Sequence, residues 1–186
     1  PVNVIGIPKT IDHDLIGTDH CPGFGSAAKY IATSVAEISL DAKIYNTPLV
    51  VIVEIMGRNA GWLTASSALA SINGNGPDLV YLPEVPFSKE QFLNDVSRVM
   101  KANDGKCVVA VSEGIRFGNG KYVGEDESDT DVFGHSALGG VCGKLKALVS
   151  SSLGVKCKAV ELNILQRCAA HCASATDVEE AFETGK

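Results

Sequence analysis

Two carboxylates stand close together near the start of the chain, in a segment whose side chains suit proton transfer. Asp12 and Asp14 are separated by one residue, and Lys9 and Thr10 come shortly before them. In an extended segment, side chains two positions apart point the same way, so one aspartate can act as a general base while the other orients it. A turn in which the aspartates accept hydrogen bonds from backbone amides explains the local pattern equally well.

Three further polar clusters each follow directly on an apolar run. In the loop Gly57–Gly61, Arg58 precedes a helical pattern, and its guanidinium and the first helix amides suit a phosphate. An ordinary surface arginine beside a helix start explains that loop as well. Glu113 and Arg167 follow two later runs, where a carboxylate for sugar hydroxyls and a cation for a phosphate would be well placed. Together, these clusters and the aspartate pair predict one shared cleft.

The apolar pattern that must position these clusters alternates between short runs and longer helical stretches. The short runs are continuously apolar, which is typical of parallel strands covered by helices on both faces. The strand candidates are Val2–Ile7, Leu49–Glu54, Asp78–Leu82, Cys107–Ser112 and Lys158–Leu162. Helices are expected near Ala27–Leu40, Trp62–Ile72, Lys89–Ala102 and Ala137–Ser151, with a capping box for one more at Thr176–Glu179. We therefore predict an α/β fold with an open, mostly parallel, doubly wound sheet, in which ligands bind beyond the carboxyl ends of the strands.

The composition excludes several classes of protein. Of the 186 residues, 45% are hydrophobic and 20% are charged, which is typical of a folded α/β protein. The net charge of −6 and the lack of a basic cluster argue against a nucleic-acid or membrane partner. No apolar run reaches the roughly 20 residues of a membrane-spanning helix, and no signal peptide pattern opens the chain. We expect a cytoplasmic protein.

Six cysteines are scattered along the chain without a C-x-x-C pair, and we interpret them as reduced core residues. Cys168, His171 and Cys172 could be imagined as metal ligands, but without a second cluster we predict no metal site within this chain. The chain begins without Met in a strand-like run and stops soon after a helix signal. We therefore expect a lobe of a larger protein.

The motifs resemble one family. Gly6–Asp14 reads GIPKTIDHD and resembles the G-[IV]-P-[GK]-T-I-D-N-D segment of phosphofructokinases. Val53–Arg58 reads VEIMGR, similar to the V-E-V-M-G-R of that family, and Pro83–Phe87 resembles the P-E-x-P-F of its pyrophosphate-using branch. Later family motifs are matched in the expected order at Phe24–Ala27, Val111–Gly114 and Leu165–Arg167. The resemblance covers residues 1–186 and implies the sugar-phosphate-binding and catalytic-base portion, without the donor-binding N-terminal part or the C-terminal part.

The resemblance also implies residue roles. Asp12 would be the general base that takes the proton from the 1-hydroxyl of fructose 6-phosphate, with Thr10, Asp14 and Lys9 completing the catalytic group. The residues implied to bind substrate are Thr10, Met56, Gly57, Arg58, Glu113, Lys158 and Arg167. Lys158 stands where an arginine from a neighbouring subunit is expected, which implies a homo-oligomer.

Lys9 bears on the phosphoryl donor. A glycine is usual there in ATP-dependent members, while a lysine resembles the pyrophosphate-dependent ones, although some ATP users also carry lysine. The resemblance thus implies a magnesium-dependent, glycolytic phosphotransferase that uses pyrophosphate, with an ATP-dependent 6-phosphofructokinase as the alternative. A non-catalytic, sugar-phosphate-binding regulatory subunit is the alternative of another class. The isolated fragment is expected to be inactive, because the donor site would lie outside it.

Three positions depart from the family pattern. His13 replaces the usual asparagine between the two acids, which is expected to alter the pKa of one of them. Ile164 stands where the family often has histidine or tyrosine, so one polar contact is expected to be lost. Leu49 replaces an arginine that bacterial ATP-dependent members supply from the neighbouring subunit.

Overall fold

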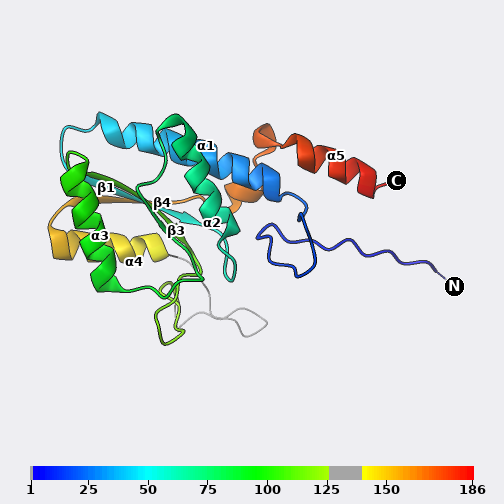
Figure 1. Cartoon of the computed structure of the whole chain (residues 1–186), viewed down its shortest axis with the longest axis horizontal. Coiled ribbons are helices and arrows are strands. Elements are labelled where there is room, and N and C mark those ends of the chain that lie inside the picture. The colour runs from blue at the N-terminus through cyan, green and yellow to red at the C-terminus, as the bar shows by residue number, and fades with distance from the viewer. Residues whose placement is uncertain (1, 126–139) are drawn as a thin grey trace.

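A parallel β-sheet forms the centre of the molecule (Figure 1). The computed structural model describes residues 2–125 and 140–186. Within them the sheet has four strands in the order β2-β3-β1-β4, and every neighbouring pair is parallel. The strands are β1 (Leu49–Ile55), β2 (Leu79–Tyr81), β3 (Lys106–Ser112) and β4 (Lys156–Glu161). The predicted α/β class and parallel sheet are confirmed.

Helices cover both faces of this sheet (Figure 1). On one face lie α1 (Phe24–Ile44) and α2 (Trp62–Ser66), the latter continued by a 3₁₀ helix, η1 (Ser67–Asn73). On the other face lie α3 (Lys89–Ala102) and α4 (Val141–Leu153). Side chains alternate along each strand, so Val51 of β1 packs in the cluster with α1 and Val50 in the cluster with α3 and α4. Apolar contact on both faces explains why the strands are continuously apolar.

The chain ends in short helices and α5. Two 3₁₀ helices follow β4, η2 (Asn163–Arg167) and η3 (Ala170–Cys172), and α5 (Ala175–Thr184) comes last. The Oγ of Ser174 accepts a hydrogen bond from the Asp177 amide and caps α5, so the cap lies two residues before the predicted Thr176.

The predicted elements agree with the structure except at the N-terminus. The helix near Lys89–Ala102 has the predicted bounds, whereas the first three residues of the helix expected at Ala137–Ser151 lie outside the described residues. Val2–Ile7 was predicted as a strand, and this is wrong. The segment is extended but pairs with no described strand, and Val4 and Ile5 are 87% and 89% exposed. An apolar run cannot become a strand without a hydrogen-bonding neighbour.

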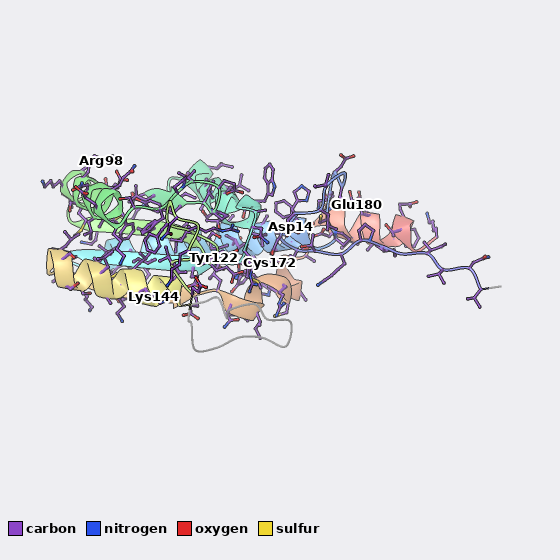
Figure 2. All side chains as sticks on the ribbon, turned by 90° about the horizontal axis from the view of Figure 1, so that it is seen from below. Asp14, Arg98, Tyr122, Lys144, Cys172 and Glu180 are labelled. Atoms are coloured by element: carbon purple, nitrogen blue, oxygen red, sulfur yellow. The ribbon has the colours of Figure 1, made fainter. Side chains whose placement is uncertain are left out.

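The N-terminal segment projects from the body of the fold and runs beside α5 (Figures 1 and 2). Ile5 and Pro8 line a groove of about 530 Å³ together with Ala181 of α5. All six cysteines are free, and five are buried, in agreement with the prediction of reduced core residues, whereas Cys168 is exposed and does not belong to the core. None of the helices in the described ranges is long and apolar enough to cross a membrane.

Candidate active site

Three loops meet at one edge of the sheet because three adjacent strands end there. The loop after β1 begins at Met56, that after β3 at Glu113, and that after β4 at Leu162. Since β3, β1 and β4 are parallel neighbours, their carboxyl ends share one edge. The predicted side chains Arg58, Glu113 and Arg167 therefore belong to adjacent loops.

Direct hydrogen bonds join the loops after β1 and β3. The Ser112 hydroxyl donates to the Gly57 carbonyl at 2.6 Å and accepts from the Gly114 amide at 3.0 Å. The Gly57 amide donates to Oε1 of Glu113 at 3.2 Å. At Gly114 a Cβ atom would overlap the carbonyl oxygen of Arg58, so only glycine permits this close approach. The Glu113 carboxylate is therefore fixed by the backbone of its neighbouring loop.

Gln166 joins the third loop to the first. This side chain is 2% exposed; its Oε1 accepts from the Met56 amide at 3.0 Å, and its Nε2 donates to the Asn163 carbonyl at 3.0 Å. Both ends of the buried amide are thus satisfied. Arg167 is the next residue, so the hydrogen bonds of Gln166 also fix the backbone from which the Arg167 side chain extends.

Asp12 lies within reach of the charges on these loops. Burial raises the pKa of the Asp12 carboxyl above its usual value, and the charge of Asp14 raises it further. The charges of Lys9, Arg167 and Arg58 act in the opposite direction without reversing the shift. The Thr10 hydroxyl accepts from the Asp12 amide at 3.3 Å, which fixes the backbone beside the carboxyl group. The predicted base is therefore surrounded by one acid and three cations from three segments.

Glu113 faces the same space. Burial raises the pKa of Glu113, while the hydrogen bond from the Gly57 amide lowers it. Among nearby charges, those of Asp12 and Glu54 raise this pKa and that of Arg58 lowers it. The charge of Asp12 therefore acts on Glu113, although the two acids come from the N-terminal segment and from the loop after β3.

A cavity of about 290 Å³ opens beside Arg167. It is lined by Ile11 from the N-terminal segment and by Gly23 and Ser26 at the start of α1, as well as by Gln166 and Arg167. A space of this kind beside an arginine suits a small anionic group.

Lys158 does not join this group. It lies within β4, where Val160 faces α1, and its Nζ donates to the Tyr45 hydroxyl at 2.6 Å and to Asp41 at 3.2 Å. Side chains two apart on a strand share a face, so Lys158 points toward α1 and away from the loops. Its predicted role in binding substrate finds no support from contacts within this chain.

The three departures from the family pattern have distinct surroundings. His13 adopts a left-handed backbone with φ of 60°, and its ring stacks on Phe24 with centroids 4.8 Å apart. Trp62 meets the same ring edge-on at 5.7 Å. Ile164 is 56% exposed, whereas Leu49 is fully buried in the core. The His13 ring thus packs in an aromatic cluster beside the acids.

Sequence reasoning missed three residues that shape the site. Gln166 and Ser112 stand directly beside predicted site residues, so their positions in the motifs were the available signal. Glu84 was seen only as part of a motif, yet its Oε1 accepts from the Gly61 amide at 2.6 Å. Gly61 is the N-cap of α2, so the helix start considered for a phosphate already holds a carboxylate of this chain.

The parallel sheet and the polar loops at its edge define an α/β domain with a candidate ligand site at the strand ends. The particular family follows from comparison with known proteins. The family model described as phosphofructokinase matches residues 1–177. The chain belongs to the phosphofructokinase family.

Two relatives show how the match is distributed. The chain is 49% identical over 192 residues to the pyrophosphate–fructose 6-phosphate 1-phosphotransferase of Xanthomonas campestris pv. campestris, covering 100% of this chain and 45% of that protein. It is 46% identical over 189 residues to the protein of the same name from Methylococcus capsulatus, covering 100% of this chain and 44% of that protein. The chain thus spans less than half the length of these relatives.

A solved structure agrees with these matches. The crystal structure of a pyrophosphate-dependent phosphofructokinase from Marinobacter aquaeolei superposes with a TM-score of 0.77 at 41% identity. The superposition covers 94% of this chain and 40% of that one. The fold of the described residues is therefore a phosphofructokinase fold.

Proposed function

We propose that this chain is the fructose 6-phosphate-binding lobe of a phosphofructokinase that transfers a phosphoryl group from pyrophosphate to the sugar. The product would be fructose 1,6-bisphosphate, as in glycolysis. The observation that carries the proposal is the position of Asp12, a partly buried carboxyl beside the charges of Lys9, Arg58 and Arg167. Relatives named as pyrophosphate-dependent enzymes along the whole chain support it.

Asp12 acts as the general base in this proposal. Its raised pKa makes its ionised form a stronger proton acceptor than an exposed aspartate, so it can take the proton of the 1-hydroxyl as the new bond to phosphorus forms. Arg58 and Lys9 then stabilise the negative charge that spreads over the transferring phosphoryl group. Thr10 and Asp14 keep the base in position.

The sugar binds across the three loops. Glu113 accepts hydrogen bonds from furanose hydroxyls, and the backbone of Met56 and Gly57 forms the wall of the pocket. Arg167, beside the cavity of about 290 Å³, holds the 6-phosphate. Gln166 and Ser112 support the proposal indirectly, since they fix the loops before any ligand arrives.

Pyrophosphate is the proposed donor, on the strength of Lys9, the PEVPF segment at Pro83–Phe87 and the names of the relatives. Mg²⁺ would neutralise charge on this donor when bound. The oxygens of Asp12 and Asp14 are of the type that Mg²⁺ prefers, but the three cations beside Asp12 do not suit a metal cage. The described residues therefore fit contact with a donor-bound metal better than a complete site of their own. The homo-oligomer and the cytoplasmic location stay predictions.

Replacing the base tests the proposal. In the full-length protein, Asp12→Asn should lower the rate of pyrophosphate-dependent fructose 1,6-bisphosphate formation by about 10²–10⁴-fold. Calorimetry should show that fructose 6-phosphate still binds, because Arg167 and Glu113 remain. Asp19→Asn, on an exposed residue nearby, is the matched control and should keep full activity. An unchanged rate in Asp12→Asn would rule out the base assignment. Absence of turnover in the unaltered full-length protein would favour the regulatory-subunit alternative, and a preference for ATP would favour the ATP-dependent one.

A further inference from the structure

Two glutamates lie side by side on the sheet face that carries α4. The register pairs Glu54 of β1 with Glu161 of β4, just as it pairs Val50 with Cys157 at the other end of the same strands. Val50 and Cys157 pack in the core cluster with α4, and the alternation of side chains puts both glutamates on that face. Like charges on directly neighbouring strand positions destabilise a sheet, so this pair needs an explanation.

The first turn of α4 adds a cysteine to the pair. The Cys142 amide donates to Oε2 of Glu54 at 2.9 Å, and its Sγ lies 3.7 Å from Oε1 of Glu161. One potential ligand atom from each of Glu54, Cys142 and Glu161 lies within 4.8 Å of the other two. The sheet register and the start of α4 therefore create a compact set of two carboxylates and one thiol.

Among the described residues, the negative charge of this set is only partly compensated. Glu54 is 6% exposed, and burial together with the charge of Glu161 raises its pKa. The α4 amides offset part of that charge, but no lysine, arginine or histidine of the described residues forms an ion pair with Glu54 or Glu161. Beside them is a cavity of about 110 Å³ whose lining includes Glu113 as a third carboxylate and, among described residues, no basic side chain.

We propose that Glu54, Cys142 and Glu161 bind a divalent cation with affinity for sulfur, of the zinc class. Zn²⁺ takes thiolate and carboxylate ligands at about 2.0–2.3 Å and commonly leaves a fourth position to water. Such bond lengths bring ligand atoms to roughly 3.3–3.8 Å of one another. The Cys142 Sγ and Glu161 Oε1 atoms already have this separation, and the other pairs need to close by at most about 1 Å. Glu161 is exposed at the end of β4, so a change of its rotamer would meet less resistance than one at the buried Glu54.

Binding is coupled to proton release. As the metal–sulfur bond forms, the Cys142 thiol loses its proton to solvent, and the cation neutralises most of the negative charge of the thiolate and the two carboxylates. The sequence predicted no metal site in this chain. That prediction failed to anticipate the cluster because its members stand 88 and 19 positions apart, without any ligand-spacing motif.

The site lies directly behind the candidate active site. Glu54 is two residues before Met56, and the cavity of about 110 Å³ touches Met56, Glu113 and Gln166 as well as the two glutamates. A cation there would attract the Glu113 carboxylate. Binding itself requires no donor and no sugar, so it can be measured whether or not the proposed function holds.

Cadmium, a spectroscopic substitute for zinc, tests the site in the full-length protein. Titration with Cd²⁺ should produce the ultraviolet sulfur-to-cadmium charge-transfer band and release about one proton per metal bound. Cys142→Ser should lose the band. Glu161→Gln, at an exposed residue at the end of β4, should weaken binding by at least about 10-fold.

Two other cysteines provide matched controls. Cys157 is buried on β4, the strand that also carries Glu161, and Cys168 is the exposed cysteine. Both Cys157→Ser and Cys168→Ser should keep the band. Retention of the band in Cys142→Ser would overturn the proposal, as would its loss in Cys168→Ser. Unchanged affinity in Glu161→Gln would also overturn it, and this variant gives an answer even if Cys142→Ser fails to fold.

Discussion

The two sides of the candidate active site are built very differently. One side, which we call the site floor, consists of Glu54–Arg58, Ser112–Gly114 and Gln166, and its parts are joined by direct hydrogen bonds at buried positions. The other side is the N-terminal segment, Val2–Asp14, most of which is exposed. It carries Asp12, whose amide donates a hydrogen bond to the Thr10 hydroxyl within the same segment.

This difference separates two tasks. The floor fixes the groups that would hold a sugar phosphate, and its geometry depends on packing within the sheet. The N-terminal segment brings the base to that floor, and charges from both sides then determine the pKa of Asp12. Substitutions in the floor should therefore affect stability and binding together, while those in the segment should act on catalysis with little effect on stability.

The largest expected effect comes from a substitution at Gly114, where the loops after β1 and β3 approach each other most closely in the site floor. Gly114→Ala places a methyl group where the Arg58 carbonyl oxygen lies, with the Gly57 carbonyl close by. Separating these two loops should lower the free energy of unfolding by roughly 1–3 kcal/mol, and fructose 6-phosphate binding should weaken in parallel. Urea unfolding and calorimetry measure the two effects. Gly118→Ala is the control, because nothing lies within 4 Å of a Cβ there.

The second prediction concerns the N-terminal segment: two substitutions there should shift the pH dependence of kcat/KM in opposite directions. The Asp14 charge raises the pKa of Asp12 and the Lys9 charge lowers it. Activity requires ionised Asp12 and is lost as the pH falls through its pKa. Asp14→Asn should therefore move the acid limb of the kcat/KM profile to lower pH, and Lys9→Met should move it to higher pH. If both variants shift the acid limb in the same direction, the limb does not report the ionisation of Asp12.

Much of this architecture could be predicted from the sequence. β1 reads LVVIVEI, and its residues are buried on both faces, so the apolar run alone indicates a covered parallel strand. The bounds of α3 follow from the cap at Ser88 and the apolar stripe that includes Phe92 and Val96. The polar loops after β1, β3 and β4 follow from the rule that parallel strands end at one edge.

Other features depend on contacts that no local pattern encodes. Val2–Ile7 has the composition of a strand, but a strand also requires a neighbour, and none of the described strands pairs with it. The contact of Lys158 with Tyr45 depends on the face of β4 on which the lysine lies, and its role in a site shared with a neighbouring subunit stays a prediction. The set formed by Glu54, Cys142 and Glu161 arises only from the register between two strands and the start of a helix.

The smallest expected effect concerns Glu54, a residue of the site floor whose negative charge opposes folding. The pKa of Glu54 is raised in the folded protein, so its ionised form destabilises the fold. This destabilisation is complete above the raised pKa and disappears as the pH falls below the usual glutamate value. In metal-free protein, Glu54→Gln should therefore raise the free energy of unfolding at neutral pH by about 0.2–1 kcal/mol and leave it unchanged in acid. The glutamine oxygen can still accept from the Cys142 amide.

Thermal or urea unfolding across this pH range measures the effect. Glu37→Gln, on the exposed side of α1, is the control and should not raise the free energy of unfolding. Added Zn²⁺ should then make the parent protein more stable than Glu54→Gln, because the cation stabilises only the protein that keeps the Glu54 carboxylate as a ligand. If Glu54→Gln is less stable than the parent protein in metal-free buffer at neutral pH, the repulsion between Glu54 and Glu161 is already compensated inside the chain. The reason for a cation at that site then disappears, while the hydrogen bonds that hold the rest of the floor are unaffected.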